Sequence, residues 1–248
     1  MSRTGLLKAA MAGLAMMVPI AAGVSAVQAK TLVIGMDSEP ATLNAHANSD
    51  NKVLQMGHLY SCFLTSLNDV NGGEIQPSVA TSWEYVSPTE VVFHLRDDVK
   101  WHNGRLLTAD DVVFTFDWVL NKDNGSIRYN NFGQVDHVEK SGEHSVTFFL
   151  KSAFPPLTEI LTYLPLVAED TIDTLDTAPI GCGPFKFNRW ERDQRIVFDT
   201  NTEYFGGPIA FDELVVRVFQ DYNAEMTAFL AGEVDIFQWF SSVDIPTI

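Results

Sequence analysis

Short apolar runs separated by turn-forming residues follow one another along most of the chain. Residues 31–36 form a β-rich run, and the polar residues 37–40, which end in proline, predict a turn after it. Residues 90–95 alternate between apolar and polar side chains, as a half-buried strand does. The same patterns predict further strands at 145–150, 185–187, 195–198, 214–219 and 233–240, with 185–187 and 195–198 paired.

Other stretches have the period of a helix. Residues 53–67 are apolar at roughly helical spacing and are predicted to form one helix. Thr108 is a good N-cap, and Asp110 and Asp111 would complement the helix dipole, so a second helix is expected to run from there to Leu120. Residues 154–164 and 223–231 are predicted to be helical as well. Helices that alternate with strands indicate an α/β fold.

The first 29 residues have the pattern of a cleavable secretory signal peptide. Arg3 and Lys8 give a positive start, and residues 9–24 are almost wholly small and apolar. This run is too short for a comfortable membrane span, which takes roughly 20 strongly apolar residues, although an uncleaved anchor is the alternative. Small side chains end the segment at Ala29, so we expect cleavage there and a mature protein that starts at Lys30.

Charge and composition restrict the function of the exported part. The chain carries 16 basic and 32 acidic residues, a net charge of −16, and loss of the two basic residues of the signal peptide takes it to −18. So acidic a surface repels nucleic acid and anionic lipid. A hydrophobic content of 46% indicates a packed core, and no later stretch is long and apolar enough to cross a bilayer.

The motifs of several enzyme classes are missing from the sequence. It contains no Gly-rich phosphate loop, no His-Glu-x-x-His and no Gly-x-Ser-x-Gly. The six histidines are scattered without helical spacing, so neither a metal site nor a cofactor is predicted. The acidic pairs at 97–98 and 110–111 are explained by solvation and helix capping rather than by acid–base catalysis. We therefore predict no catalytic residues and no enzyme activity.

Cys62 and Cys182 are the two cysteines of the chain, and export would take them to a compartment where disulfides can form. Their spacing does not require a bond, so pairing is the alternative and two buried thiols are the interpretation that we favour. Two cysteines are in any case too few for a fold built on disulfides.

A longer pattern resembles a known family. Residues 95–104 (LRDDVKWHNG), followed by 107–114 (LTADDVVF), closely resemble the signature of family 5 extracytoplasmic solute-binding proteins, the dipeptide-, oligopeptide- and nickel-binding receptors of ABC importers. Further blocks match in the expected order at residues 59–64, 76–83, 179–187, 204–208 and 232–236. In the block at 179–187, Cys182 stands where the family usually has threonine. These turn and cap residues also have structural reasons, so they identify the family more than the ligand.

The resemblance implies an α/β receptor of the periplasmic-binding-protein type II kind, whose two lobes close around a ligand by hinge motion. In this family the first lobe is discontinuous, which assigns residues 30–59 and 179–248 to lobe I and residues 60–178 to an inner subdomain packed against it. Members are typically about twice as long as this chain. The second lobe, and the segment that returns to lobe I, are therefore expected to be absent.

The resemblance also implies which residues face the ligand. Such receptors hold a peptide through main-chain hydrogen bonds and an acidic partner for its amino terminus, which would lie in the absent half. This half would contribute Asn48, Ser49 and Asp50 from the loop after the first strand. Arg128 and Tyr129 of the inner subdomain would join them.

The predicted function is the capture of small peptides or similar solutes in the periplasm and their delivery to the permease subunits of an ABC importer. The protein would be a monomer, peripheral to the membrane, without a cofactor and without nucleic acid as a partner. Two alternatives stay open: a truncated receptor fragment that binds nothing, and a secreted hydrolase.

Overall fold

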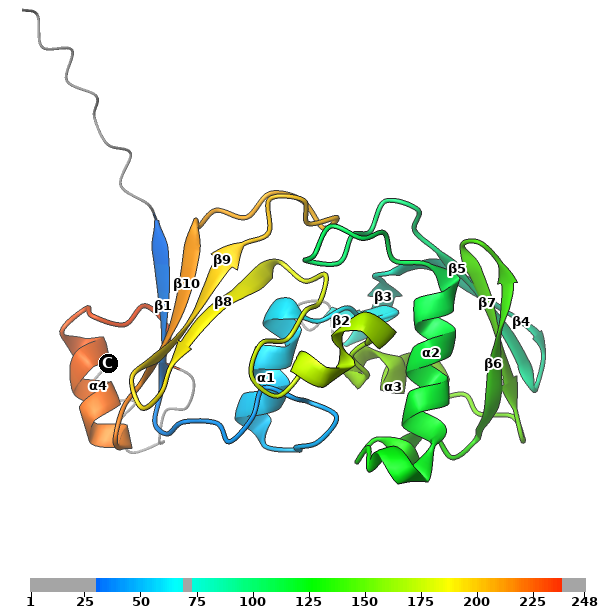
Figure 1. The fold of residues 1–248 in the computed structure, drawn as a ribbon, viewed down its shortest axis with the longest axis horizontal. Helices are drawn as coiled ribbons and strands as arrows, with labels where there is room; N and C mark the ends of the chain where they lie inside the picture. The colour runs from blue at the N-terminus through cyan, green and yellow to red at the C-terminus, as the bar shows by residue number, and fades with distance from the viewer. Residues whose placement is uncertain (1–29, 69–72, 238–248) are drawn as a thin grey trace, which may run out of the picture.

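The computed structural model of the 248-residue chain describes residues 30–68 and 73–237. These residues build two four-stranded sheets, with helices and a two-stranded ribbon between them (Figure 1). The signal peptide predicted for residues 1–29 lies outside the described residues.

The first sheet has the strand order β1-β10-β9-β8. Its strands are β1 (Thr31–Met36), β8 (Phe185–Glu191), β9 (Arg195–Thr200) and β10 (Glu213–Val218). β1 pairs in parallel with β10, and the other two pairings are antiparallel, which confirms all four predicted strands and the pairing of β8 with β9. The helices α1 (Asn51–Tyr60) and α4 (Tyr222–Leu230) lie on opposite sides of this sheet (Figure 1).

The two faces of β1 meet different neighbours because side chains alternate along a strand. Ile34 and Met36 are buried in one apolar cluster with Met56 and Tyr60 of α1. Gly35 faces the other way and lies directly against α4. The apolar cluster between β1 and α1 is the core of the first sheet.

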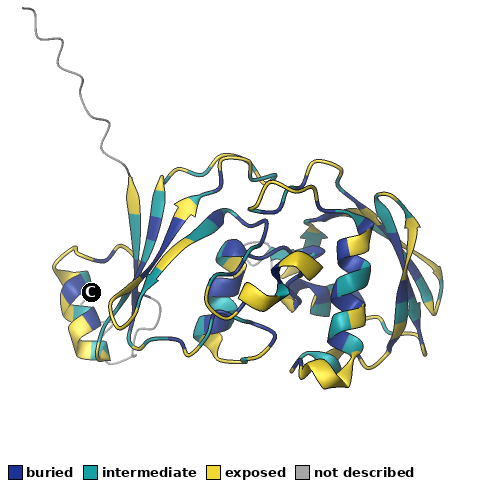
Figure 2. Ribbon diagram, viewed as in Figure 1, coloured by how far each residue is buried: buried dark blue, intermediate teal, exposed yellow. Residues whose placement is uncertain are grey.

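The second sheet has the order β4-β5-β7-β6 and is antiparallel throughout. Its strands are β4 (Ala80–Ser87), β5 (Glu90–Leu95), β6 (Val135–Gly142) and β7 (Ser145–Leu150). The helix α2 (Ala109–Leu120) packs on it with one buried side and one exposed side (Figure 2). Phe116 of α2 meets Phe148 of β7 with ring centroids 4.7 Å apart, and this contact is central to a second apolar cluster.

Short elements fill the space between the two sheets. They are the ribbon strands β2 (Thr65–Asn68) and β3 (Glu74–Pro77), the short helix α3 (Leu157–Ile160), and the 3-10 turns η2 (Lys122–Asn124), η3 (Tyr129–Phe132), η4 (Leu161–Tyr163) and η5 (Glu169–Thr174). The helix predicted at 154–164 is thus divided between α3 and η4.

The corner before α2 has the cap that the sequence predicts, with one refinement. Thr108 is the N-cap, and its backbone N–H donates to the carboxylate of Asp111 at 2.9 Å. The same carboxylate accepts the indole N–H of Trp101 at 3.1 Å and pairs with Arg105 at 2.7 Å. Asp111 is therefore a buried centre of hydrogen bonds, whereas Asp110 is exposed.

Two of the predicted elements are wrong in extent. The single helix expected over 53–67 ends at Tyr60, and β2 starts at Thr65, because the backbone N–H groups of Val79 and Ala80 donate to the intervening residues and hold them extended. Of the strand expected at 233–240, the described residues form an isolated parallel bridge between Ile236 and Ile34. The remainder lies outside the described residues.

The favoured interpretation of two free thiols is also wrong, since Cys62 and Cys182 form a disulfide with their Cα atoms 5.1 Å apart. Backbone contacts bring them together. Gly183 donates its N–H to the carbonyl of Tyr60 at 2.9 Å, and a Cβ at Gly181 would overlap that same carbonyl oxygen. The two cysteines are separated by 120 positions, so no local pattern reports this contact.

Reduction of the disulfide should destabilise the protein. A bridge across 120 residues restricts the unfolded chain strongly, and we expect its loss to lower the free energy of unfolding by about 2–4 kcal/mol. Urea unfolding with and without dithiothreitol measures this change. The Cys62→Ala/Cys182→Ala double variant is the control: it should match the reduced wild type and ignore dithiothreitol. Identical unfolding midpoints for the oxidised and reduced wild type would contradict the prediction.

Candidate functional site

The loop predicted to face a ligand, residues 48–50, leads directly into α1. The side chain of Asp50 caps the helix by accepting the backbone N–H of Lys52 at 2.9 Å, and the side chain of Asn48 accepts the N–H of Asp50 at 2.8 Å. Ser49 is exposed between them. Asn48 and Asp50 therefore fix the shape of the loop, each through its Oδ1 atom.

Arg128, which lies in the part of the chain that packs on the second sheet, bonds to the residues just before this loop. Its guanidinium donates two hydrogen bonds, from Nε at 3.2 Å and from Nη2 at 3.0 Å, to the carbonyl of Ala45. The next residue back, Ile127, donates its backbone N–H to the carbonyl of His46 at 3.0 Å. The structure thus brings the loop of residues 44–50 and the segment that carries Arg128 together, although they lie about 80 positions apart.

Tyr129 follows Arg128 but points to a different partner. The ammonium of Lys122 lies 5.1 Å from the centre of its ring, a cation–π contact between η2 and η3. Tyr129 is half-buried there. The structure shows no contact between Tyr129 and the loop of residues 48–50 in the described part of the chain.

Arg128 also lines a small hollow of about 130 Å³, together with Asn131, Phe132, Ile160 and Tyr163. Burial lowers the pKa of its guanidinium, yet an arginine stays charged at neutral pH. Within the described residues Arg128 takes part in no ion pair. A partly buried guanidinium without an acidic partner is suited to bind a carboxylate.

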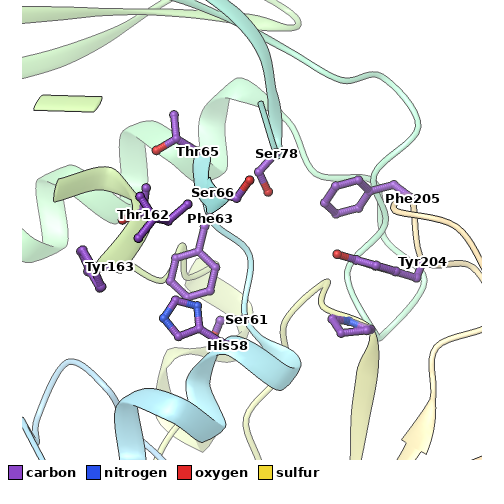
Figure 3. A pocket seen from close by; sticks show the side chains of 12 residues that line it. His58, Ser61, Phe63, Thr65, Ser66, Ser78, Thr162, Tyr163, Tyr204 and Phe205 are labelled. Atoms are coloured by element: carbon purple, nitrogen blue, oxygen red, sulfur yellow. The ribbon is translucent and has the colours of Figure 1, made fainter. Parts of the chain in front are cut away.

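A larger hollow of about 290 Å³ lies beside the first, and Tyr163 lines both. We call it the aromatic hollow (Figure 3). Rings from three stretches of the chain line it, and so do several hydroxyl side chains. The rings are those of His58, Phe63, Tyr163, Tyr204 and Phe205, and the hydroxyl groups include those of Ser61, Ser66, Ser78 and Thr162. Sequence reasoning missed this hollow because its residues come from segments far apart in the chain, and some of them belong to motifs that have structural reasons.

His46 supports the loop from inside. It is almost fully buried, and its Nε2 lies 2.9 Å from the carbonyl of Pro165, which requires the Nε2–H tautomer. Its ring also meets Trp118 edge-on. Burial, and to a smaller extent the charge of Arg128, lowers the pKa of His46 from 6.5 to about 4, against the opposing effect of the Pro165 hydrogen bond. His46 is therefore a neutral core histidine.

A cluster of polar and charged side chains that the sequence did not predict lies at the carboxyl end of β1. Lys52 pairs with Asp37 at 2.7 Å and also contacts the hydroxyl of Ser38. The carboxylate of Glu225 is buried beside them, against Gly35. Burial and the negative charge of Asp37 raise the pKa of Glu225 to about 7, with Lys52 acting in the opposite direction. No local pattern within α4 distinguishes this glutamate from an exposed one.

The described residues contain no group of three or more histidine, cysteine or acidic side chains placed to hold a metal ion. None of the helices within these residues has the length and apolar character needed to cross a membrane.

Known proteins resemble this chain in sequence. A family model described as "Bacterial extracellular solute-binding proteins, family 5 Middle" matches residues 74–248. The oligopeptide-binding protein AppA of Bacillus subtilis is 30% identical over an alignment that covers 85% of this chain and 41% of AppA. The dipeptide-binding protein of Escherichia coli is 27% identical over an alignment that covers 99% of this chain and 50% of that protein. The chain thus spans half or less of the length of these relatives.

Solved structures resemble it in fold. AppA from Bacillus subtilis in complex with a nonapeptide superimposes with a TM-score of 0.79 at 28% identity, over 88% of this chain and 45% of AppA. AgaA from Agrobacterium tumefaciens R10 in complex with agropinic acid gives a TM-score of 0.81 at 26% identity, with the same coverage. These matches confirm the predicted α/β fold of the type II periplasmic-binding-protein kind, of which the chain has a part.

His46 should make stability depend on pH. The folded protein disfavours protonated His46, so the unfolded state binds more protons between pH 6.5 and 4, and stability is lost as the pH falls through this window. The loss that His46 contributes should approach about 3 kcal/mol. Denaturant unfolding of the wild type and His46→Gln at pH 7.5 and pH 4 measures it. Gln keeps an N–H for Pro165 without titrating, so an equal loss in both proteins would refute the assignment.

Glu225 should make the stability of the fold depend on pH in the opposite direction. Because its pKa is raised in the fold, the folded state holds its proton more tightly, and stability is lost as the pH rises from about 4.5 through 7. Glu225→Gln removes the buried charge, so the variant should melt at a higher temperature than the wild type at pH 8 and near the wild-type temperature at pH 5. A variant that melts lower at pH 8 would show that the carboxylate stabilises the fold.

Proposed function

The chain belongs to family 5 of the bacterial extracellular solute-binding proteins, and on that basis we propose that it is the substrate-binding component of an ABC importer. Its solutes would be small peptides or similar compounds that carry a carboxylate. The observation that carries this proposal is the partly buried guanidinium of Arg128, which lines a hollow and has no acidic partner among the described residues.

We assign the solute contacts as follows. Arg128 pairs with a carboxylate of the solute, since its planar fork matches that group. Ser49 and the backbone of the loop offer hydrogen bonds, while Asn48 and Asp50 hold the loop in place through their own side chains. Tyr129, whose ring lies against Lys122, would contact the solute from the position next to Arg128.

The names of the relatives favour such solutes. AppA is an oligopeptide-binding protein, and its structure holds a nonapeptide. The Escherichia coli relative is a dipeptide-binding protein, and AgaA holds agropinic acid. Relatives that are named for binding rather than for turnover also favour a receptor over an enzyme.

We further propose that residues 30–59 and 179–248 form lobe I and that residues 60–178 form the inner subdomain. The distribution of the apolar clusters supports this division. One cluster joins residues 34–60 to residues 185–216, and the other lies between Cys62 and Cys182. The exported receptor would act in the periplasm as a monomer and pass its solute to the permease subunits, after the signal peptide of residues 1–29 is removed.

Calorimetric titration with a dipeptide, for example Ala-Tyr, and with its C-terminal amide tests the proposal. We expect the free acid to bind, and the amide and the Arg128→Gln variant to bind about 10–100-fold more weakly, because a charged hydrogen bond of about 1.5–3 kcal/mol is lost. Arg192→Gln, at an exposed position outside both hollows, is the control and should bind like the wild type.

Each alternative has its own outcome in this experiment. Absence of heat with any peptide, from a protein that melts cooperatively, would favour a fragment without binding activity. Cleavage of the peptide, detected by mass spectrometry after incubation, would favour a hydrolase. Equal affinity for the acid and the amide would overturn the role of Arg128 but not solute binding itself.

A further inference from the structure

The aromatic hollow has a lining that is unusual for so acidic a chain. Among the described residues that form it there is no aspartate, glutamate, lysine or arginine. A charged group that entered it would give up its water without gaining an opposite charge, which is costly. The lining therefore favours uncharged ligand groups over charged ones.

The rings of the hollow form two opposing walls. His58, Phe63 and Tyr163 lie on one side, and Tyr204 and Phe205 lie on the other, with the space between them open (Figure 3). Within the first wall His58 and Phe63 stack, with ring centroids 4.6 Å apart. Aromatic walls of this kind favour a flat partner that stacks on them or meets them edge-on.

Three of the hydroxyl groups in the hollow are available to a ligand, and two others are engaged with the backbone. Those of Ser66 and Thr162 donate to backbone carbonyls, at 3.3 and 2.7 Å. Those of Ser61, Ser78 and Tyr204 form no hydrogen bond with other described residues. Burial raises the pKa of Tyr204, so its phenol keeps its proton and can donate.

From these features we propose that the aromatic hollow is a binding subsite for one uncharged ring that bears a hydroxyl group, such as a tyrosyl side chain or a neutral sugar. A volume of about 290 Å³ is at the lower end of the range for small-molecule sites, so it suits a single ring rather than a whole peptide. The ring stacks between the walls, and its hydroxyl exchanges hydrogen bonds with Ser61, Ser78 or Tyr204.

The position of the hollow connects it with the site of Arg128. Tyr163 lines both hollows, so one solute can place its carboxylate at Arg128 and its ring in the aromatic hollow. In this respect the inference rests on the proposed function. The ring specificity of the hollow itself does not depend on Arg128.

Gly206 allows Tyr204 to stand where it does. A Cβ at residue 206 would overlap the outer atoms of the Tyr204 ring, and the glycine has no left-handed backbone that alanine would strain. Gly206→Ala should therefore move the Tyr204 ring without breaking the fold. This substitution changes the wall of the hollow without removing any of its lining side chains.

Three small probes test the hollow directly by saturation-transfer NMR: 4-methylphenol, methyl β-D-glucopyranoside and 4-methylbenzoate at neutral pH. We expect one or both of the uncharged probes to bind and the charged benzoate to bind at least 10-fold more weakly. The two uncharged probes distinguish a tyrosyl side chain from a sugar as the source of the ring. Equal binding of all three, or binding of the benzoate alone, would overturn the proposal.

Variants locate the probe. Tyr204→Phe, which removes one hydroxyl, should weaken binding about 5-fold, and Gly206→Ala should weaken it further. Tyr85→Ala, at an exposed position on β4, is the control and should have no effect. Circular dichroism verifies the fold of each variant. Unchanged binding in both hollow variants would place the probe elsewhere and refute the assignment.

Failure of this inference and failure of the proposed function give different results. If Ala-Tyr and Ala-Lys bind equally well and no uncharged probe binds, the receptor function stands and the ring subsite is wrong. If an uncharged probe binds in the hollow but no peptide binds anywhere, the subsite stands and the peptide-receptor function is wrong.

Discussion

The end of α1 and the segment of residues 181–183 approach each other so closely that their backbones are in contact, and the two halves of the structure are joined there. The carbonyl of Tyr60 accepts the N–H of Gly183, and side chains larger than hydrogen at residues 181 and 183 would overlap the backbone of α1. His102 donates its backbone N–H to the carbonyl of Gly181 at 2.7 Å, and Asn201 donates to the carbonyl of Gly183 at 2.9 Å. Residues 181–183 are thus hydrogen-bonded to α1, to the corner before α2 and to the loop that carries Tyr204.

The aromatic hollow adjoins this junction through Ser61 and Pro184. The aromatic hollow takes residues from α1, from β2, from η4 and from the loop after Asn201. Of these segments, α1 and the loop after Asn201 are hydrogen-bonded to Gly183. The Cys62–Cys182 bond connects the same two segments covalently. A rigid junction keeps the walls of a binding site at a fixed distance, which reduces the ordering that a ligand must otherwise impose.

Charge is distributed unevenly between the surface and these sites. The chain as a whole carries a net charge of −16, yet the smaller hollow has the guanidinium of Arg128, and the described lining of the larger one has no acidic side chain. His46 beneath the loop is neutral, so it adds no second charge beside Arg128. An acidic surface around a cationic pocket concentrates favourable interaction with an anionic group at one place.

Local patterns in the sequence determined the elements and the family. The β-rich run 31–36, the alternation along 90–95 and the Thr108 cap each depend on neighbouring residues. Each was predicted correctly because β propensity, period and capping act within a few positions. The resemblance implied Arg128 as a ligand contact, and the structure adds that its guanidinium bonds to the carbonyl of Ala45. Other features needed the tertiary structure: the end of α1 at Tyr60, the Cys62–Cys182 bond, the buried Glu225 and the aromatic hollow. Each is produced by contacts between segments that are far apart in the chain, where close backbone approach and burial, rather than local propensity, decide the outcome.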